Sequence, residues 1–272
     1  ARCYVGRFQP KRGRFEPEQH VRMNWPGGMF FAPESLLDGK GRRVFWAWVT
    51  DPRIQPAQKA GSGFQSLPRV MDLTADGTLT IAPPEELAAL RRRHRRLKNI
   101  TVKHGETVPL QGVGGQAVEL DFDVDVSRCA HFGIALRCSP DDKERTLVWL
   151  VNGRGSLVVD ASRSTQRRDV TYGSPPFVSY GIADARWNPS PYPSFEAPLK
   201  LQQGERLRLR VFLDGCLLEA FANGRQAVTQ AVFPSRPDSL EVKAMVHQGE
   251  AVIHSVDAWQ MGPIAVRDER AD

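Results

Sequence analysis

The chain has 272 residues, of which 41% are hydrophobic and 25% are charged, and it carries a formal net charge of +6 at pH 7. No segment approaches the roughly 18–20 consecutive apolar residues that a membrane-spanning helix needs, so we expect no membrane partner. The run RRRHRRLK (91–98) holds six of the 37 basic residues, and the remaining 31 equal the acidic residues. A nucleic-acid-binding chain would show a broader basic face, so we expect no nucleic-acid partner.

Residues 1–84 are predicted to form the first domain, built of short strands with turn-rich joints. The chain contains 23 glycines and 20 prolines, and many short runs alternate apolar with polar residues. This pattern is typical of an all-β chain. Within the first domain VFWAWV (44–49) is a continuous apolar run, which predicts a strand buried on both faces.

Residues 85–99 are predicted to be a linker that contains a helix over 85–98. Two prolines precede Glu85 and Glu86, and the basic run lies toward the other end, as the helix dipole prefers. Four residues fall on one face at helical spacing, namely Leu87, Leu90, His94 and Leu97. The sequence therefore predicts a short helix, docked by its leucine stripe, between two β domains.

Residues 100–265 are predicted to form a β-sandwich, and residues 266–272 a tail. Residues 206–233 show two tight hairpins, with turns at Asp214-Gly215 and Asn223-Gly224. Asp214, Asn223 and the intervening Glu219 are expected to determine the fold rather than to act in catalysis. The other predicted strands are VELDFDV (118–124), FGIALR (132–137), LVWLV (147–151), SLVVD (156–160), SLEVKAMV (239–246) and AVIHSVDAW (251–259).

Several segments of this chain resemble one enzyme family. VFLDGCLLEAFANG (211–224) resembles the (V/F)-D-x-S-x-(V/L)-E-x-F-x-N-(D/G)-G run of glycoside hydrolase family 32, the invertases, inulinases, levanases and other β-fructofuranosidases. WPGGMFFAPESLLDGKGRRVFWAWVTDPR (25–53), GSGFQSLPR (61–69) and CYVGRF (3–8) are similar to further segments of that family, in the family's order. The resemblance implies the C-terminal portion of a five-bladed β-propeller followed by a jelly-roll-like β-sandwich. It also implies hydrolysis of β-fructosides such as sucrose, inulin or levan, without metal or cofactor.

The family's catalytic motifs do not occur in this chain. The resemblance implies a nucleophile in a W-M-N-D-P-N-G motif, an aspartate in R-D-P and a general acid in E-C-P, all ahead of the position that CYVGRF matches. We therefore assign no catalytic residue. Asp38 is expected to form a turn and Asp51 to support a loop. Glu34 lies where the family tolerates glutamine, so it is expected only to line a substrate site.

The aromatic residues of the first domain are better candidates for a sugar site. By the resemblance, Phe31 and Trp48 match a tyrosine and a tryptophan that lie toward the central funnel of the propeller. Aromatic rings suit sugars because the C–H face of the sugar packs on the ring. Phe31, Trp48 and Glu34 are therefore predicted to bind substrate, with blade-core packing as the alternative for each aromatic. We expect at most one of Trp46 and Trp48 to face the funnel.

Two features of the second domain stay open at this point. A second sugar site could involve Trp187, Tyr192 or Trp259. The four cysteines are expected to be isolated thiols, although Cys129 and Cys138 could lie on neighbouring strands and form a bridge.

Three functions fit these observations. The chain could be the C-terminal part of a retaining β-fructoside hydrolase that is inactive alone, or a non-catalytic carbohydrate-binding module. It could also be one half of a split enzyme that needs an N-terminal partner. An incomplete propeller leaves open strand edges and apolar faces, so without that partner the chain is expected to self-associate.

Overall fold

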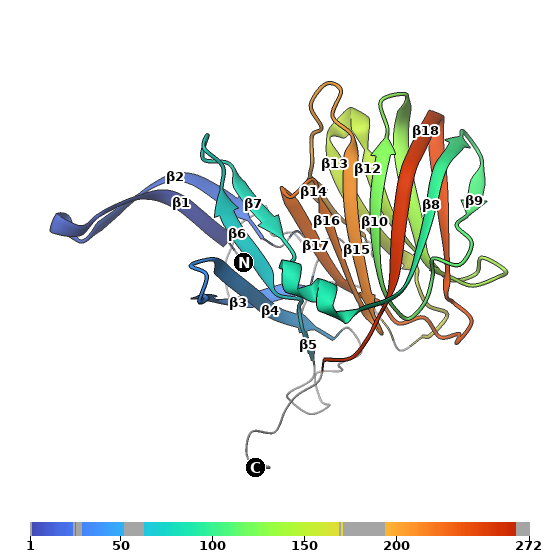
Figure 1. Cartoon of the computed structure of the whole chain (residues 1–272), viewed down its shortest axis with the longest axis horizontal. Coiled ribbons are helices and arrows are strands. Elements are labelled where there is room, and N and C mark those ends of the chain that lie inside the picture. Colours follow the sequence, from blue (N-terminus) through green and yellow to red (C-terminus); the bar gives the residue numbers. More distant parts are fainter. Residues whose placement is uncertain are drawn as a thin grey trace, which may run out of the picture.

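The computed structural model describes residues 2–23, 25, 29–51, 63–168, 170 and 194–264. In these residues the structure consists of β-strands and three short 3-10 helices, which confirms the predicted all-β fold class. Figure 1 shows three parts: a projecting arm, a small sheet and a larger sandwich. None of the described helices has the length and apolar character to cross a membrane.

The arm is an antiparallel pair of strands, β1 (Arg2–Gln9) and β2 (Arg14–Arg22), joined by the 3-10 helix η1 (Pro10–Arg12). Gly13 closes the turn with a φ of 57°, a left-handed conformation that glycine adopts without strain. Within the part of the chain that the structure describes, the two strands pair only with each other. The arm therefore extends away from the rest of the molecule as a two-stranded ribbon (Figure 1).

The small sheet is an antiparallel meander of the kind that forms one blade of a propeller. Its strands are β3 (Phe30–Leu37), β4 (Arg43–Thr50), β6 (Arg69–Leu73) and β7 (Leu79–Ala82), in that order, with β5 (Gly63–Gln65) also paired to β4. We call this sheet the blade. The buried face of β4 carries Phe45, Ala47 and Val49, which are at most 2% exposed.

The segment between the blade and the sandwich differs from the helix that the sequence predicts. A 3-10 helix, η2, ends at Leu90, and residues Arg91–Lys103 form a 13-residue strand, β8. The helix prediction is wrong beyond Leu90 because β8 pairs along almost its full length with another strand, β18, and its apolar residues Leu97, Ile100 and Val102 pack on the sandwich core. Tertiary pairing thus overrides the helical spacing of the leucines.

The sandwich consists of two sheets joined by the 21-residue strand β18 (Glu241–Met261), which takes part in both. One sheet, the β10 sheet, contains β8, β10 (Ala117–Asp125), β15 (Leu207–Asp214), β16 (Leu217–Ala222) and β17 (Gln226–Ala231). The other, the β11 sheet, contains β9 (Thr107–Pro109), β11 (Cys129–Cys138), β12 (Arg145–Val151), β13 (Ser156–Arg163) and β14 (Ser194–Pro198). The 3-10 helix η3 (Asn152–Arg154) connects β12 to β13.

A single apolar core fills the space between the two sheets. Its fully buried members alternate along the strands with outward-facing residues, as a half-buried sheet requires. They include Leu120 and Phe122 of β10, Ile134 of β11, Leu150 of β12 and Leu209 of β15. This arrangement fixes which side chains of each sheet face outward.

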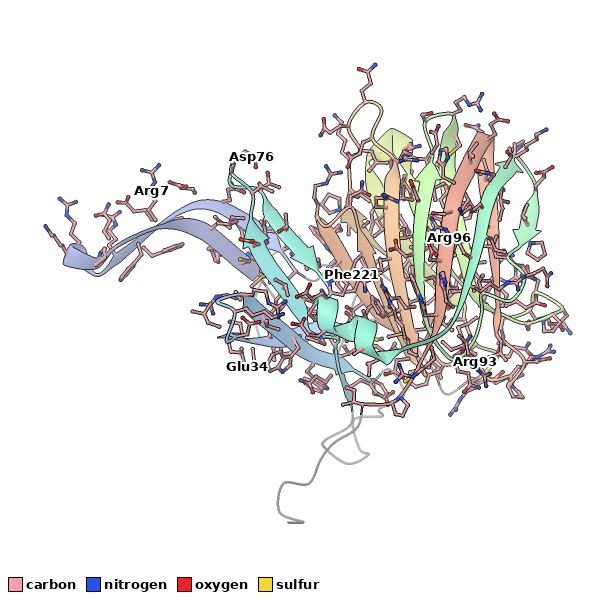
Figure 2. All side chains as sticks on the ribbon, in the orientation of Figure 1. Arg7, Glu34, Asp76, Arg93, Arg96 and Phe221 are labelled. Carbon is pink, nitrogen blue, oxygen red and sulfur yellow. The ribbon has the colours of Figure 1, made fainter. Side chains whose placement is uncertain are left out.

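The blade packs against the outer face of the β10 sheet at β15–β17. Phe212, Phe221 and Ala227 of the sandwich join Phe30 and Phe45 of the blade in one buried apolar cluster. Figure 2 shows Phe221 where the blade meets the sandwich. The blade is therefore anchored through one face, and its other face is left for the candidate site.

Cys129 and Cys138 do not form a bridge. They lie at the two ends of the same strand, β11, and both are free thiols. Nine steps along a strand separate their Cα atoms by about 30 Å. A disulfide requires less than about 7 Å, so the bridge that we left open in the sequence is wrong.

Candidate functional site

The structure brings Phe31, Glu34 and Trp48 onto one face of the blade. Phe31 lies opposite Trp48 in the pairing of β3 with β4, and Glu34 lies opposite Trp46. Residues three apart in a regular strand point to opposite faces, but a bulge separates Phe31 from Glu34 and leaves Ala32 with a φ of 45°. The bulge therefore places Phe31 and Glu34 on the same side of the sheet.

This face carries a pocket of about 400 Å³. Eight residues line it: Ala32, Glu34, Trp46, Ala47, Trp48, Gly63, Phe64 and Gln65. Phe31 is absent from this lining, but its ring packs edge-on against Trp48 with centroids 6.3 Å apart. Trp48 and Glu34 thus form the wall, and Phe31 supports Trp48 from the side.

Two expectations about β4 are wrong. Trp46 and Trp48 both line the pocket, because residues two apart in a strand point to the same face. The strand is also not buried on both faces: Phe45, Ala47 and Val49 are buried, whereas Trp46 and Trp48 are half-buried. The apolar run VFWAWV therefore combines a packed face with an aromatic pocket face.

Glu34 is the one carboxylate in the pocket lining. It is exposed and has no hydrogen bond or ion pair with the described residues (Figure 2). With indole rings beside it, the carboxylate can accept hydrogen bonds from the hydroxyl groups of a ligand whose apolar side lies on the rings. The pocket can therefore bind a sugar, but it presents a single carboxylate.

Asp38 has the turn role that its sequence predicts. Its carboxylate accepts hydrogen bonds from the backbone N–H groups of Lys40 and Arg42, at 2.9 and 2.8 Å, and from Arg42 Nε at 2.8 Å. Although burial opposes its ionisation, the bonds from Arg42 and Lys40 hold the pKa of Asp38 below its usual value. The same turn reaches η2, where Arg42 and Lys40 both bind Glu86 and lower its pKa to about 2. Asp38 is thus a structural group.

Asp51 follows β4 and is 7% exposed. It is not among the pocket-lining residues, so the structure does not place it beside Glu34 in the candidate site. The described residues also contain no group of three or more His, Cys, Asp or Glu side chains that could hold a metal ion.

Of the three residues suggested for a second sugar site, the structure describes Trp259. Trp187 and Tyr192 lie outside the described residues. The Arg91 guanidinium lies 3.8 Å from the ring centroid of Trp259, and the His94 ring stacks on it at 4.9 Å. Both groups already pack on the indole of Trp259, which leaves less of the ring for a sugar.

An ion pair that was not predicted from the sequence joins the blade to the sandwich. Arg69, at the start of β6, binds Glu219 of β16, and both residues are 1% exposed. Glu219 Oε1 also accepts a hydrogen bond from the backbone N–H of Leu67, which lies two residues beyond the pocket residue Gln65. The likeness of SLPR (66–69) and EAF (219–221) to segments of the family was the one signal that could have suggested this contact.

The described residues thus form an all-β protein in which a propeller-type blade, with an aromatic pocket on one face, packs on a β-sandwich. Residues 1–83 match the model of the glycosyl hydrolases family 32 N-terminal domain, and residues 86–260 match that of the family 32 C-terminal domain. The chain belongs to glycoside hydrolase family 32.

Relatives from several kingdoms align with nearly all of this chain. It is 26% identical to a sucrose-6-phosphate hydrolase of Zymomonas mobilis, over 94% of this chain and 46% of the relative. It is 24% identical to the insoluble isoenzyme 3 of β-fructofuranosidase from Oryza sativa, over 90% and 46%. The chain thus spans about half the length of these curated relatives.

Solved structures support the same fold. Fructan 1-exohydrolase IIa of Cichorium intybus, in complex with 1-kestose, superposes with a TM-score of 0.77 at 22% identity, over 95% of this chain and 54% of the other. Exo-inulinase of Aspergillus awamori superposes with a TM-score of 0.70 at 20% identity, over 95% and 49%. At these identities the likeness establishes the fold alone.

Proposed function

We propose that this chain forms part of the sugar-binding wall and the sandwich domain of a family 32 enzyme that acts on β-fructosides, and that it does not hydrolyse them alone. The observation that carries the proposal is the pocket in which Trp46, Trp48 and Glu34 share one face. The named activities of the relatives, on sucrose 6-phosphate, β-fructofuranosides and fructans, give the substrate class.

The chemistry of the pocket supports binding rather than turnover. A retaining glycosidase needs a nucleophile and a proton donor whose carboxyl groups lie about 5 Å apart. Glu34 is the one acidic residue that lines the pocket, and neither Asp38 nor Asp51 joins it there. The motifs W-M-N-D-P-N-G and E-C-P are also absent from the sequence. The chain therefore supplies a wall that positions the sugar while the reacting carboxylates come from elsewhere.

The arm has the features of a surface that could dock an N-terminal propeller portion. Tyr4, Phe8 and Phe15 are 54%, 62% and 44% exposed. Tyr4 and Phe8 are four residues apart on β1 and so share a face, and Phe15 lies opposite Phe8. An exposed aromatic strip beside open strand edges is typical of a docking surface.

The charge of the arm favours an acidic partner over a second copy. Residues 2–22 contain six basic and two acidic residues, a net charge of +4. Two such arms repel each other, whereas a strand bearing carboxylates would be attracted. We therefore propose an N-terminal propeller portion as the partner, with self-association as the weaker alternative in its absence.

The test of the function is fructose release from sucrose, inulin and levan by the full chain, together with sugar binding measured by calorimetry. We expect sucrose binding that Trp48→Ala weakens at least tenfold, and no fructose release from any of the three sugars. Turnover would contradict the proposal, and Glu34→Gln and Asp51→Asn would then identify the reacting groups. If the chain neither binds nor hydrolyses these sugars, the pocket has no sugar-binding role.

The test of the partner is a complementation experiment with the N-terminal half of a family 32 propeller. Mixing the two chains is expected to restore hydrolysis, and the double variant Phe8→Ser/Phe15→Ser is expected to weaken the complex. Sedimentation of the isolated chain measures self-association in parallel. If the double variant restores activity as well as the unchanged chain does, the arm is not the docking surface.

A further inference from the structure

A second aromatic surface lies on the outer face of the β11 sheet, in a different part of the molecule from the blade pocket. Trp149 of β12 stands opposite Gly133 of β11. A Cβ atom placed on Gly133 would lie 2.5, 2.6 and 2.8 Å from Cε3, Cζ3 and Cδ2 of Trp149. Three consecutive ring atoms can be nearly equidistant from one point only if that point lies over the face of the ring. The indole therefore lies flat on the backbone of β11.

The outer side of this indole is the part that a ligand could contact. Trp149 is half-buried, and one of its two faces is covered by Gly133. Its exposed surface therefore belongs to the opposite face and the ring edge. The indole N–H donates no hydrogen bond to a described residue, and no described ring or guanidinium stacks on Trp149. In this respect Trp149 differs from Trp259, on which both Arg91 and His94 pack.

Trp149 also packs against a small apolar cluster of Ala135, Cys138, Leu147 and Met245. Polar side chains lie farther out on the same face of the sheet. His131 lies two residues from Gly133 on β11, and it stacks on His247 of β18 with centroids 5.2 Å apart. On the other side Val158 of β13 lies opposite Trp149, and Glu196 of β14 lies opposite Val158. The aromatic surface is thus flanked by imidazole groups on one side and by a carboxylate on the other.

The charged side chains around Trp149 are already paired with one another, which favours a neutral ligand. Glu196 binds Arg154 with Oε2 and Nη2 3.2 Å apart. Lys243, which lies on the same face of β18 as His247, has Glu241 and Asp142 at 3.3 and 3.7 Å. A charged ligand would have to compete with these pairs, whereas hydroxyl groups can share their remaining acceptors and donors.

A protein partner fits this face less well than a saccharide. The large hydrophobic residues that the described structure leaves exposed are Tyr4, Phe8, Phe15, Leu36, Leu37, Leu73 and Ile264, and none belongs to the β11 sheet. A protein interface would be expected to offer a contiguous apolar patch. A single flat indole with polar neighbours is the combination that binds the C–H face and the hydroxyl rim of one sugar unit.

We propose that Trp149, resting on Gly133, is the centre of a second carbohydrate-binding surface, which holds a neutral fructan chain on the outer face of the sandwich. The site follows from the geometry of Trp149, whereas the choice of a fructan rests on the proposed function. Such a surface would keep a polymeric substrate on the protein while its end occupies the blade pocket.

The experiment is calorimetric titration of the full chain and its variants with inulin. Trp48→Ala weakens the blade pocket, so the inulin binding that remains in this variant is expected to report the Trp149 surface alone. In that background Trp149→Ala is expected to weaken binding at least tenfold, and Trp149→Phe less, because a smaller ring keeps part of the stacking. Trp259→Ala is the matched control and is expected to leave binding unchanged. Thermal melts of each variant establish that it is folded.

The outcomes separate this inference from the proposed function. Loss of all binding in Trp48→Ala, with Trp149→Ala unchanged, would overturn the second surface and leave the pocket in place. If Trp149→Ala loses inulin binding and Trp48→Ala binds inulin as well as the unchanged chain does, the second surface is supported and the pocket is not. If inulin does not bind to the unchanged chain, both are wrong. If Trp149→Ala and Trp259→Ala lose inulin binding to the same extent, the effect comes from removing any indole, and the inference is also overturned.

Discussion

Arg69 of the blade and Glu219 of the sandwich form an ion pair in which Nη2 and Oε2 are 2.5 Å apart, with both residues 1% exposed. The guanidinium also lies 4.2 Å from the ring centroid of Phe30 and 5.3 Å from that of Phe221. Thr229 donates a second hydrogen bond to Glu219 Oε2, at 3.2 Å. The junction of the two domains is therefore an apolar cluster with one charge pair at its centre.

Glu219→Ala is expected to lower the free energy of unfolding by about 3–5 kcal/mol, because it leaves the Arg69 guanidinium buried without its counter-charge. Urea unfolding at pH 7 measures the effect. The double variant Arg69→Met/Glu219→Leu removes both charges and is expected to recover most of the loss. A loss of under 1 kcal/mol in Glu219→Ala would show that water reaches the pair.

Gly63→Ala is expected to displace the pocket indole. The added Cβ would overlap Nε1 of Trp48, so the ring has to move out of the position that forms the pocket wall. We expect a shift in tryptophan fluorescence and a several-fold weaker binding of sugar. Stability is also expected to fall, because Gly63 has a φ of 154° and the Cβ would lie 2.8 Å from the backbone oxygen of Val49. Gly39→Ala is the control, because a Cβ there has no atom within 4 Å. Unchanged sugar binding in Gly63→Ala would mean that the indole does not contact the ligand.

Glu119 is expected to contribute to the loss of stability in acid. Burial opposes its ionisation, but hydrogen bonds and charges from Arg91 and Arg210 outweigh burial and hold its pKa below the usual 4.5. Because the folded-state pKa is lowered, this contribution is present above about pH 4.5 and is lost as the pH falls through the folded-state pKa.

Glu119→Gln is therefore expected to cost about 2 kcal/mol at pH 7, and to lose less further stability than the unchanged chain between pH 4.5 and pH 2.5. Urea unfolding across that range measures both. The variant lacks the titrating group. If the free energy of unfolding falls equally with pH in the two proteins, the assignment to Glu119 is wrong.

Cys129 and Cys138 are expected to resist alkylation in the native protein. Burial raises the pKa of Cys129 to about 11 and that of Cys138 to about 12, so at pH 8 almost no thiolate is present. Mass spectrometry after iodoacetamide treatment should show labelling at Cys3 and Cys216 first. In denaturant all four cysteines should react, because none is in a disulfide. Early labelling of Cys138 would indicate local opening of β11.

Much of the strand pattern could be predicted because each strand alternates with period 2 and ends at a turn residue. The hairpin at Asp214-Gly215 forms where the sequence places it, and Gly215 has the φ of 58° that such a turn needs. At Asn223 the φ is 50°, and its side chain accepts a hydrogen bond from Arg208 N–H across the hairpin. In these cases the turn-forming residues alone were enough to predict the hairpin.

The basic run at 91–98 shows where local reasoning fails. Leu87, Leu90 and Leu97 have helical spacing, yet residues 91–103 form a strand. The reason is that β18 pairs with the backbone of this segment and the sandwich core accommodates Leu97. The register shifts between Ala258 and Gln260, beside Arg93, which has a φ of 45°. A single sequence contains no direct sign of a partner strand about 150 residues away.

The sequence by itself determined the all-β class, the turns, and the aromatic and carboxylate residues of the blade, because these depend on residue type and short spacing. Only the tertiary structure decided that Trp46 and Trp48 share a pocket with Glu34, that Glu219 meets Arg69, and that Trp149 lies on Gly133. Each of these contacts depends on a bulge or on the register between strands. Strand register is set by the packing of the whole sheet, so no local segment of the sequence specifies it.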